Sequence, residues 1–345
     1  MPYELPPDRR TGRRRAIVQW ATFLLAALLV ATLAYLGYVG FEGSRQAVEP
    51  GRSRDCRTPA LAFGWEYEAI NYDAASDEAL ADQSDPTDCD VEPVLAGGAL
   101  RTPDGIGLAA WYVPAASGAG PGGPTIVLAH GHGVNKSGML SRAEVLHADY
   151  NLVLLDFRNH GQSAAAVTTV GLAERNDLRT VIDWLTATKG PEQIGVLGVS
   201  MGGSAAISEA RADERVDALV LESTHATLAN ALQARLELSG YPLSLPGAWA
   251  ILLGGLVRTG QDMSAADPLQ AIEDYGPRPL LLINGRRDDT FGPTDADDLL
   301  AAALAGGAAA QLRVCDAAGH AQSLRACPDE YRDWVLGFFA DALGG

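Results

Sequence analysis

The chain of 345 residues is long enough for one large α/β domain with an appendage, or for two modest domains. Its formal net charge is -17, and five arginines lie within the first fifteen residues, so the remainder is more acidic still. Because no basic patch is left to bind a phosphate backbone, we exclude nucleic acid as a partner.

The first predicted element is a membrane-spanning helix over residues 16–41, which contain no charged side chain. About 23 residues at a rise of 1.5 Å give roughly 34 Å of helix, which exceeds a hydrocarbon core of about 30 Å. The arginine-rich residues 1–15 predict a cytoplasmic tail. We therefore expect a single-pass cell-membrane protein whose catalytic domain lies outside the cytoplasm.

A cleaved export signal is the alternative for this segment, because Arg14 and Arg15 precede it as in a twin-arginine signal. The apolar stretch is longer than the usual signal core of about 7–15 residues, and no clear small-x-small cleavage site follows. We expect an uncleaved signal-anchor. Both interpretations place the downstream chain on the same side of the membrane.

The cysteines agree with export, because all four follow the predicted membrane helix: Cys56, Cys89, Cys315 and Cys327. An even number of cysteines in an oxidising compartment favours disulfides. Of the three possible pairings, Cys56–Cys89 with Cys315–Cys327 is favoured because it closes two local loops. Four unpaired cysteines remain the alternative. No CxxC or Cys/His spacing predicts a metal site.

Residues 42–93 are polar and acidic, with a few aromatic side chains. They predict either an extracytoplasmic linker that lifts the catalytic body from the membrane, or a small cap packed on that body. Calcium binding by the acidic residues is a weaker interpretation, because no twelve-residue ligand loop is visible.

From residue 94 to the end, short apolar runs alternate with amphipathic stretches. The apolar runs predict strands over residues 99–102, 108–113, 125–129, 152–156, 194–199, 218–221, 279–283 and 311–314. The amphipathic stretches predict helices over residues 139–148, 173–186, 201–212, 295–304 and 329–343. This alternation predicts an α/β fold whose mostly parallel sheet is covered on both faces.

The alternation is interrupted over residues 224–275, where apolar spacing predicts two amphipathic helices. We interpret them as a lid above the sheet that shapes an apolar substrate pocket, with additional core packing as the alternative. The pocket candidates in this region are His225, Leu228 and Trp249.

The short apolar run over 194–199 ends at a serine with glycines two positions before and after it, in the sequence Gly198-x-Ser200-x-Gly202. The spacing fits a nucleophile elbow, in which a strand turns sharply into a helix and exposes the serine hydroxyl. A tight structural turn would need the same glycines, so the motif requires supporting context.

The context comes from residues that follow other strands. A serine hydroxyl needs an adjacent base, and that base needs an acid to orient it. Residues 284–289 follow a predicted strand and offer Asp288 and Asp289, and His320 follows the strand over 311–314. Because the carboxyl ends of parallel strands meet at one edge of a sheet, these side chains should converge with Ser200.

The chain from about residue 95 resembles an α/β-hydrolase-fold serine hydrolase. It is similar to membrane-anchored α/β-hydrolase-domain proteins and to the catalytic domain of prolyl-oligopeptidase-like enzymes. The segments that carry the resemblance follow the family's order: 130–133 (HGHG), 156–163 (DFRNHGQS), 198–202 (GVSMG), 284–288 (NGRRD) and 319–320 (GH).

The resemblance implies a catalytic triad of Ser200 as nucleophile, His320 as general base and then acid, and Asp288 as the group that orients His320. Asp289 is the alternative acid. Met201, which follows the nucleophile, is expected to supply one backbone N–H of the oxyanion hole. The resemblance assigns the other N–H to His132, and implies that the segment over 156–161 braces the loop beside the active site.

The sequence thus predicts a serine hydrolase that cleaves carboxylic esters or thioesters through an acyl-enzyme, with a small-molecule or lipid-like acyl substrate. No cofactor is implied. A peptidase of prolyl-oligopeptidase-like type and an acyltransferase are alternatives that share the same acyl-enzyme chemistry. An inactive membrane-tethered binding protein on the same fold is the alternative from another class.

Overall fold

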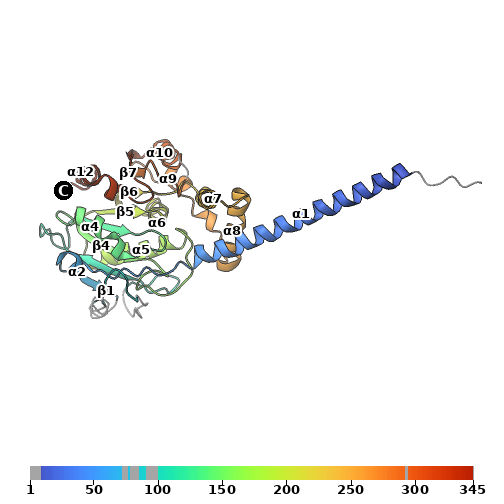
Figure 1. Cartoon of the computed structure of the whole chain (residues 1–345). Coiled ribbons are helices and arrows are strands. Elements are labelled where there is room, and N and C mark those ends of the chain that lie inside the picture. Colours follow the sequence, from blue (N-terminus) through green and yellow to red (C-terminus); the bar gives the residue numbers. More distant parts are fainter. Residues whose placement is uncertain (1–8, 72–76, 78–84, 91–99, 292–293, 345) are drawn as a thin grey trace, which may run out of the picture.

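The computed structural model describes residues 9–71, 77, 85–90, 100–291 and 294–344. A single long helix, α1 (Arg9–Val48), projects from a rounded body that contains the remaining elements, as Figure 1 shows. The N-terminal part of α1 is exposed, and only its last turns contact the body. By length and composition α1 is able to span a membrane.

The body is built on an eight-stranded sheet in the order β1-β2-β4-β3-β5-β6-β7-β8. β1 and β2 pair antiparallel at one edge, β2 is antiparallel to β4, and all other neighbours are parallel. The strands are Glu68–Ile70, Ala109–Val113, Thr125–Ala129, Asn151–Asp156, Ile194–Val199, Val216–Glu222, Pro279–Gly285 and Ala309–Cys315. The predicted fold class, an α/β fold with a mostly parallel sheet, is confirmed.

The central strands β3, β4, β5 and β6 are buried on both faces, as continuous apolar runs predict. On one face Val127 and Val196 belong to a core shared with α5, α6 and α10, whereas on the other Leu128 and Leu197 pack with α4 and α12. These helices are α4 (Leu140–Leu146), α5 (Glu174–Thr188), α6 (Met201–Ala210), α10 (Asp295–Ala305) and α12 (Pro328–Leu343), with the short helices η1 (Lys136–Met139) and α11 (Ser323–Ala326) between them.

The interruption predicted over residues 224–275 is helical. Two longer helices, α7 (Leu228–Leu238) and α8 (Ser244–Thr259), are followed by the short helices η2 (Met263–Ala265) and α9 (Pro268–Glu273). Thr227 caps α7 by accepting a hydrogen bond from the N–H of Asn230. The insertion leaves the sheet after β6 and returns to it at β7, so it lies beside the carboxyl ends of the strands.

The acidic segment over 42–93 contributes the end of α1 and one strand of the sheet. α2 (Pro59–Phe63) precedes β1, which pairs with β2, and Trp111 of β2 donates to Asp77 through Nε1 at 3.0 Å. The sheet therefore begins before residue 94, where we expected the catalytic domain to start. The sequence did not reveal β1 because this strand is short and pairs with a distant partner. Residues 72–76, 78–84 and 91–99 lie outside the described residues. The strand predicted over 99–102 is absent from its described part, residues 100–102, where Arg101 forms only an isolated antiparallel bridge with Gly107.

Both favoured disulfides are present. Cys56 pairs with Cys89, and Cys315 pairs with Cys327. The first joins the segment after α1 to the acidic segment, and the second ties the end of β8 to the start of α12. The loop that carries His320 lies between Cys315 and Cys327, so the second disulfide closes this loop at its base.

Candidate active site

Ser200 occupies the sharp turn between β5 and α6. Its backbone has φ of 55° and ψ of -119°, a region that L residues avoid unless the surrounding structure imposes it. A Cβ at Gly198 would lie 2.6 Å from the carbonyl oxygen of Gly202, and a Cβ at Gly202 would overlap the Ala129 carbonyl. The glycines thus allow the turn to close, which is the geometry of a nucleophile elbow.

Ser200, His320 and Asp288 lie within hydrogen-bonding distance in that order. The Nε2 atom of His320 is 3.1 Å from Ser200 Oγ, and its Nδ1 atom is 2.9 Å from Asp288 Oδ2. Because a carboxylate only accepts hydrogen bonds, Nδ1 carries the proton and Nε2 presents its lone pair to the serine hydroxyl. The arrangement is able to remove the Ser200 proton and to hold the resulting imidazolium.

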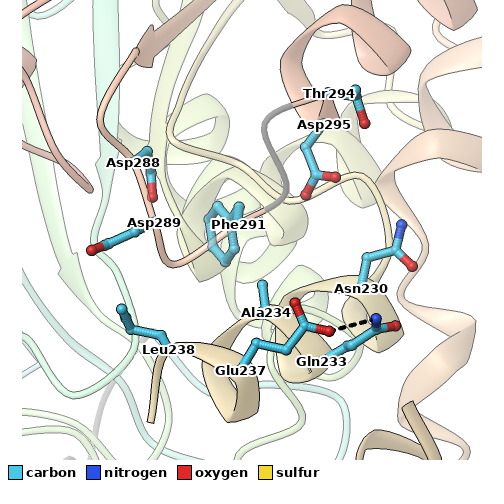
Figure 2. Close-up of a pocket in the computed structure, with 10 residues that line it drawn as sticks. All are labelled: Asn230, Gln233, Ala234, Glu237, Leu238, Asp288, Asp289, Phe291, Thr294 and Asp295. Carbon is cyan, nitrogen blue, oxygen red and sulfur yellow. Dashed lines mark hydrogen bonds between the residues drawn. The ribbon is translucent and has the colours of Figure 1, made fainter. Parts of the chain in front are cut away.

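The two candidate acids point to different surroundings. The Asp288 side chain is 2 % exposed and faces His320, whereas Asp289 is exposed. Both aspartates line a recess of about 480 Å³. Figure 2 shows it between the loop that follows β7 and the α7 helix. Asp288 is therefore the carboxylate placed to orient the His320 imidazole. Asp289 lines the recess and makes no hydrogen bond to His320 in the described structure.

The two predicted oxyanion donors lie beside the serine. Met201 is the first residue of α6, and a Cβ built on Gly131, next to His132, would lie 3.4 Å from Ser200 Cβ. In the part of the chain that the structure describes, neither the Met201 N–H nor the His132 N–H donates a hydrogen bond to protein. Both amides are therefore candidate donors to an oxyanion formed at Ser200.

A cavity of about 480 Å³ opens onto Ser200 and His320. The predicted pocket residues His225 and Leu228 line it, but Trp249 does not: its side chain is 55 % exposed on α8. The prediction for Trp249 was wrong because α8 carries apolar side chains on two faces, and Trp249 lies on the outer, exposed face. Six residues of α1 also line the cavity, which the sequence did not predict: Tyr38, Val39, Glu42, Gly43, Gln46 and Ala47.

Known proteins resemble this chain in both sequence and structure. The family model described as "alpha/beta hydrolase fold" matches residues 124–276. The uncharacterized protein YqkD of Bacillus subtilis (strain 168) is 30% identical over 222 residues, which cover 62% of this chain and 70% of that protein. The chain belongs to the α/β-hydrolase family.

Two solved structures agree with this α/β-hydrolase in fold. The Pyrococcus furiosus esterase Pf2001 has a TM-score of 0.65 at 23% identity, and the match covers 86% of this chain and 100% of that chain. The Pyrococcus horikoshii acylaminoacyl peptidase has a TM-score of 0.52 at 15% identity, covering 68% of this chain and 40% of that chain. Esterases and peptidases thus share the fold of this hydrolase.

The other histidines around the site of the hydrolase have lowered pKa values, which favours their neutral form. Burial lowers the pKa of His225 to about 4 and that of His130 to about 3. Burial also lowers the pKa of His132 and of His160. His160 accepts a hydrogen bond from the Gly133 N–H at Nε2, so it braces the loop that carries His132.

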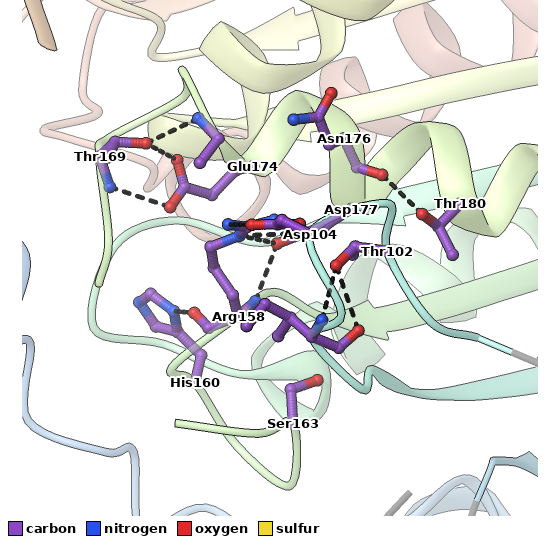
Figure 3. A network of polar contacts seen from close by, with 12 residues as sticks. Thr102, Asp104, Arg158, His160, Ser163, Thr169, Glu174, Asn176, Asp177 and Thr180 are labelled. Carbon is purple, nitrogen blue, oxygen red and sulfur yellow. Dashed lines mark hydrogen bonds and ion pairs between the residues drawn. The ribbon is translucent and has the colours of Figure 1, made fainter. Parts of the chain in front are cut away.

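The segment over 156–161 forms a polar network beneath this loop. Arg158 is bound between Asp177, which its Nη2 atom contacts at 2.7 Å, and Asp104, which its Nη1 atom contacts at 2.7 Å. Figure 3 shows these ion pairs together with the hydrogen bond from His160 to the Arg158 carbonyl oxygen. The network fixes the backbone from which His160 reaches Gly133, as the resemblance implied for a bracing role.

A buried ion pair behind the site escaped the sequence analysis. Arg142 of α4 donates to both carboxylate oxygens of Glu222 at 2.8 Å, and the Tyr331 hydroxyl donates to the same carboxylate at 2.8 Å. Arg142 also donates to the carbonyl oxygen of Ala321, next to His320. The sequence contains one indication of this ion pair, Glu222, because a carboxylate at the end of an apolar strand requires a buried partner.

We expect Arg142→Met to lower the free energy of unfolding of this hydrolase by about 3–5 kcal/mol, because it leaves the Glu222 carboxylate buried without its cation. Urea unfolding of the detergent-solubilised protein measures the effect. Arg286→Met is the matched control: the Arg286–Asp316 pair is exposed, so its loss should cost less than about 1 kcal/mol. Equal losses in the two variants would contradict the prediction.

Proposed function

We propose that the chain is a membrane-anchored serine hydrolase that cleaves carboxylic esters or thioesters through an acyl-enzyme. The observation that carries the proposal is the chain of hydrogen-bonding distances from Ser200 Oγ through His320 to Asp288. A buried carboxylate behind a singly protonated imidazole is the arrangement that activates a serine hydroxyl.

The proposed reaction starts with attack of Ser200 Oγ on the substrate carbonyl carbon while His320 Nε2 takes the hydroxyl proton. The Met201 and His132 amides stabilise the tetrahedral oxyanion. His320 then returns the proton to the leaving alcohol or thiol, and an acyl-enzyme remains on Ser200. A water molecule, deprotonated by His320, attacks this ester and releases the carboxylic acid.

The structure also bears on whether α1 remains attached. Its residues wall the cavity at Ser200, and the His132 ring donates through Nε2 to the Ala47 carbonyl oxygen at 2.9 Å. Removal of α1 as a signal would therefore open the cavity and free the ring next to a proposed oxyanion donor. This favours an uncleaved anchor, with the arginine-rich tail in the cytoplasm and the catalytic domain outside.

Labelling of the full-length protein with a fluorophosphonate probe tests the proposal. We expect one adduct, which mass spectrometry of the peptides should place on Ser200, because only an activated serine attacks the phosphorus. In the same preparation p-nitrophenyl butyrate should be hydrolysed and an aminoacyl p-nitroanilide should not. An unlabelled protein would contradict a serine mechanism, and preferred cleavage of the anilide would indicate a peptidase.

A further inference from the structure

Hydrogen bonds attach the insertion to α1 at both ends of α8. The Tyr35 hydroxyl donates to the Pro242 carbonyl oxygen at 2.6 Å, just before α8 begins. At the other end of α8, Arg258 donates to Ser44 Oγ at 2.9 Å. The two helices therefore run in the same direction, with the start of α8 nearest to the N-terminal, apolar part of α1.

Glycines bring α1 and α8 into close contact. A Cβ at Gly40 would lie 2.7 Å from the carbonyl oxygen of Ala250, and one at Gly254 would lie 2.6 Å from the carbonyl oxygen of Gly40. Small residues that allow two backbones to approach are typical of helix pairs packed within membranes. The pair thus forms one unit, as the adjacent ribbons of α1 and α8 in Figure 1 illustrate.

The position of this unit relative to a bilayer follows from α1. Residues 16–34 are uncharged and precede the first hydrogen bond to the insertion, and nineteen residues of helix extend about 28 Å, close to the thickness of a hydrocarbon core. If α1 spans the membrane, Tyr35 and the start of α8 lie at its outer boundary.

The outer face of α8 suits that boundary. Residues 238–257 contain no charged side chain. Large apolar side chains on this stretch are exposed: Leu243 by 49 %, Leu245 by 50 %, Trp249 by 55 % and Leu253 by 62 %. A contiguous patch of this kind marks an interaction surface, and its continuity with the apolar part of α1 identifies the lipid bilayer as the occupant.

The cavity connects this surface to the nucleophile. Its lining runs from Ser200 and His320 to Tyr38 of α1 and Tyr241, which precedes α8. Tyr38 and Tyr241 lie within three residues of the Tyr35–Pro242 contact, at the membrane end of the helix pair. An acyl chain that leaves the outer leaflet there would reach Ser200 without crossing open water.

We infer that α8 lies in the outer membrane interface beside α1, and that the hydrolase takes a membrane-resident acyl ester directly from the bilayer through the cavity between α1 and α7. The inference rests on the proposed function for the chemical step. The bilayer contact itself does not require catalysis, so the two can be tested separately.

The contact is tested with full-length protein in phosphatidylcholine vesicles. An environment-sensitive fluorophore is attached to Leu245→Cys, at the start of α8, and, as the matched control, to Leu304→Cys on α10. The two side chains are exposed by 50 % and 54 %. Brominated lipid should quench the first label and leave the second unaffected, also in protein that carries Ser200→Ala. Equal quenching of the two labels would overturn the inference.

The substrate route is tested with two esters, 4-methylumbelliferyl oleate within the vesicles and p-nitrophenyl acetate in water. Leu245→Glu should lower the ratio of oleate to acetate hydrolysis roughly tenfold, because a carboxylate at the interface weakens the docking of α8. Leu304→Glu should leave the ratio unchanged. An unchanged ratio in Leu245→Glu overturns the inference, whereas a parent protein inactive on both esters overturns the proposed function instead.

Discussion

Replacing Ser200 by alanine should lower kcat for p-nitrophenyl butyrate by about 10⁶-fold, because no other group is placed to form the acyl-enzyme. The Ser200 hydroxyl is 3.1 Å from His320 Nε2, and Ser200 lines the cavity. The methyl group of alanine removes the nucleophile but fits the same turn, so thermal unfolding should be close to that of the parent protein. A coupled measurement of both quantities checks the prediction.

Ser204→Ala is the matched control for this experiment. Ser204 is buried one turn further along α6, and its hydroxyl lies 3.3 Å from His225 Nε2 rather than from His320. We expect this variant to keep most of the activity. Substantial hydrolysis by Ser200→Ala, or an equal loss in Ser204→Ala, would show that the elbow serine does not carry the reaction.

The elbow was predictable because its requirement is local. A backbone at φ of 55° between a strand and a helix leaves room only for glycine two residues before and two residues after Ser200, and the sequence shows Gly198 and Gly202 directly. The approach of Asp288 and His320 followed from topology, since both residues come after neighbouring parallel strands, β7 and β8. Hydropathy and residue spacing were therefore sufficient to propose most of the candidate triad.

The wall of the cavity could not be predicted in the same way. Hydropathy identifies α1 as a candidate membrane span but does not show that its last turns pack on α8 and line the cavity. The spacing of Trp249 with Leu252, Leu253 and Leu256 defined an apolar face without showing what it faces. In the structure the glycine-bearing side of α8 meets α1, so the face with Trp249 is left exposed.

The ion pair of Arg142 with Glu222 was hidden for a related reason. The two residues are 80 positions apart, and nothing in either local pattern indicates which charged side chain of a surface helix turns inward. The edge strand β1 is similar, because three residues in an acidic segment carry too little periodicity to reveal a partner in β2. The sequence alone therefore does not reveal which distant partner a short strand or a charged side chain pairs with.

Asp288→Asn should lower kcat by about 10⁴-fold while leaving the fold intact. The Asp288 carboxylate accepts a hydrogen bond from His320 Nδ1 at 2.9 Å, which keeps the proton on Nδ1 and leaves Nε2 free to act as a base. An asparagine amide that donates to Nδ1 would favour the other tautomer, in which Nε2 carries the proton and cannot accept the one from Ser200. The loss should thus appear in kcat, with little change in KM.

Asp289→Asn provides the matched control, because it makes the same chemical change one residue away. The Asp289 side chain is exposed in the recess of Figure 2 and makes no hydrogen bond to His320 in the described part of the chain. Esterase assays of both variants should therefore differ by orders of magnitude. If Asp289→Asn caused the larger loss, the acid of the triad would have to be reassigned, and the loop after β7 would have to adopt another conformation during catalysis.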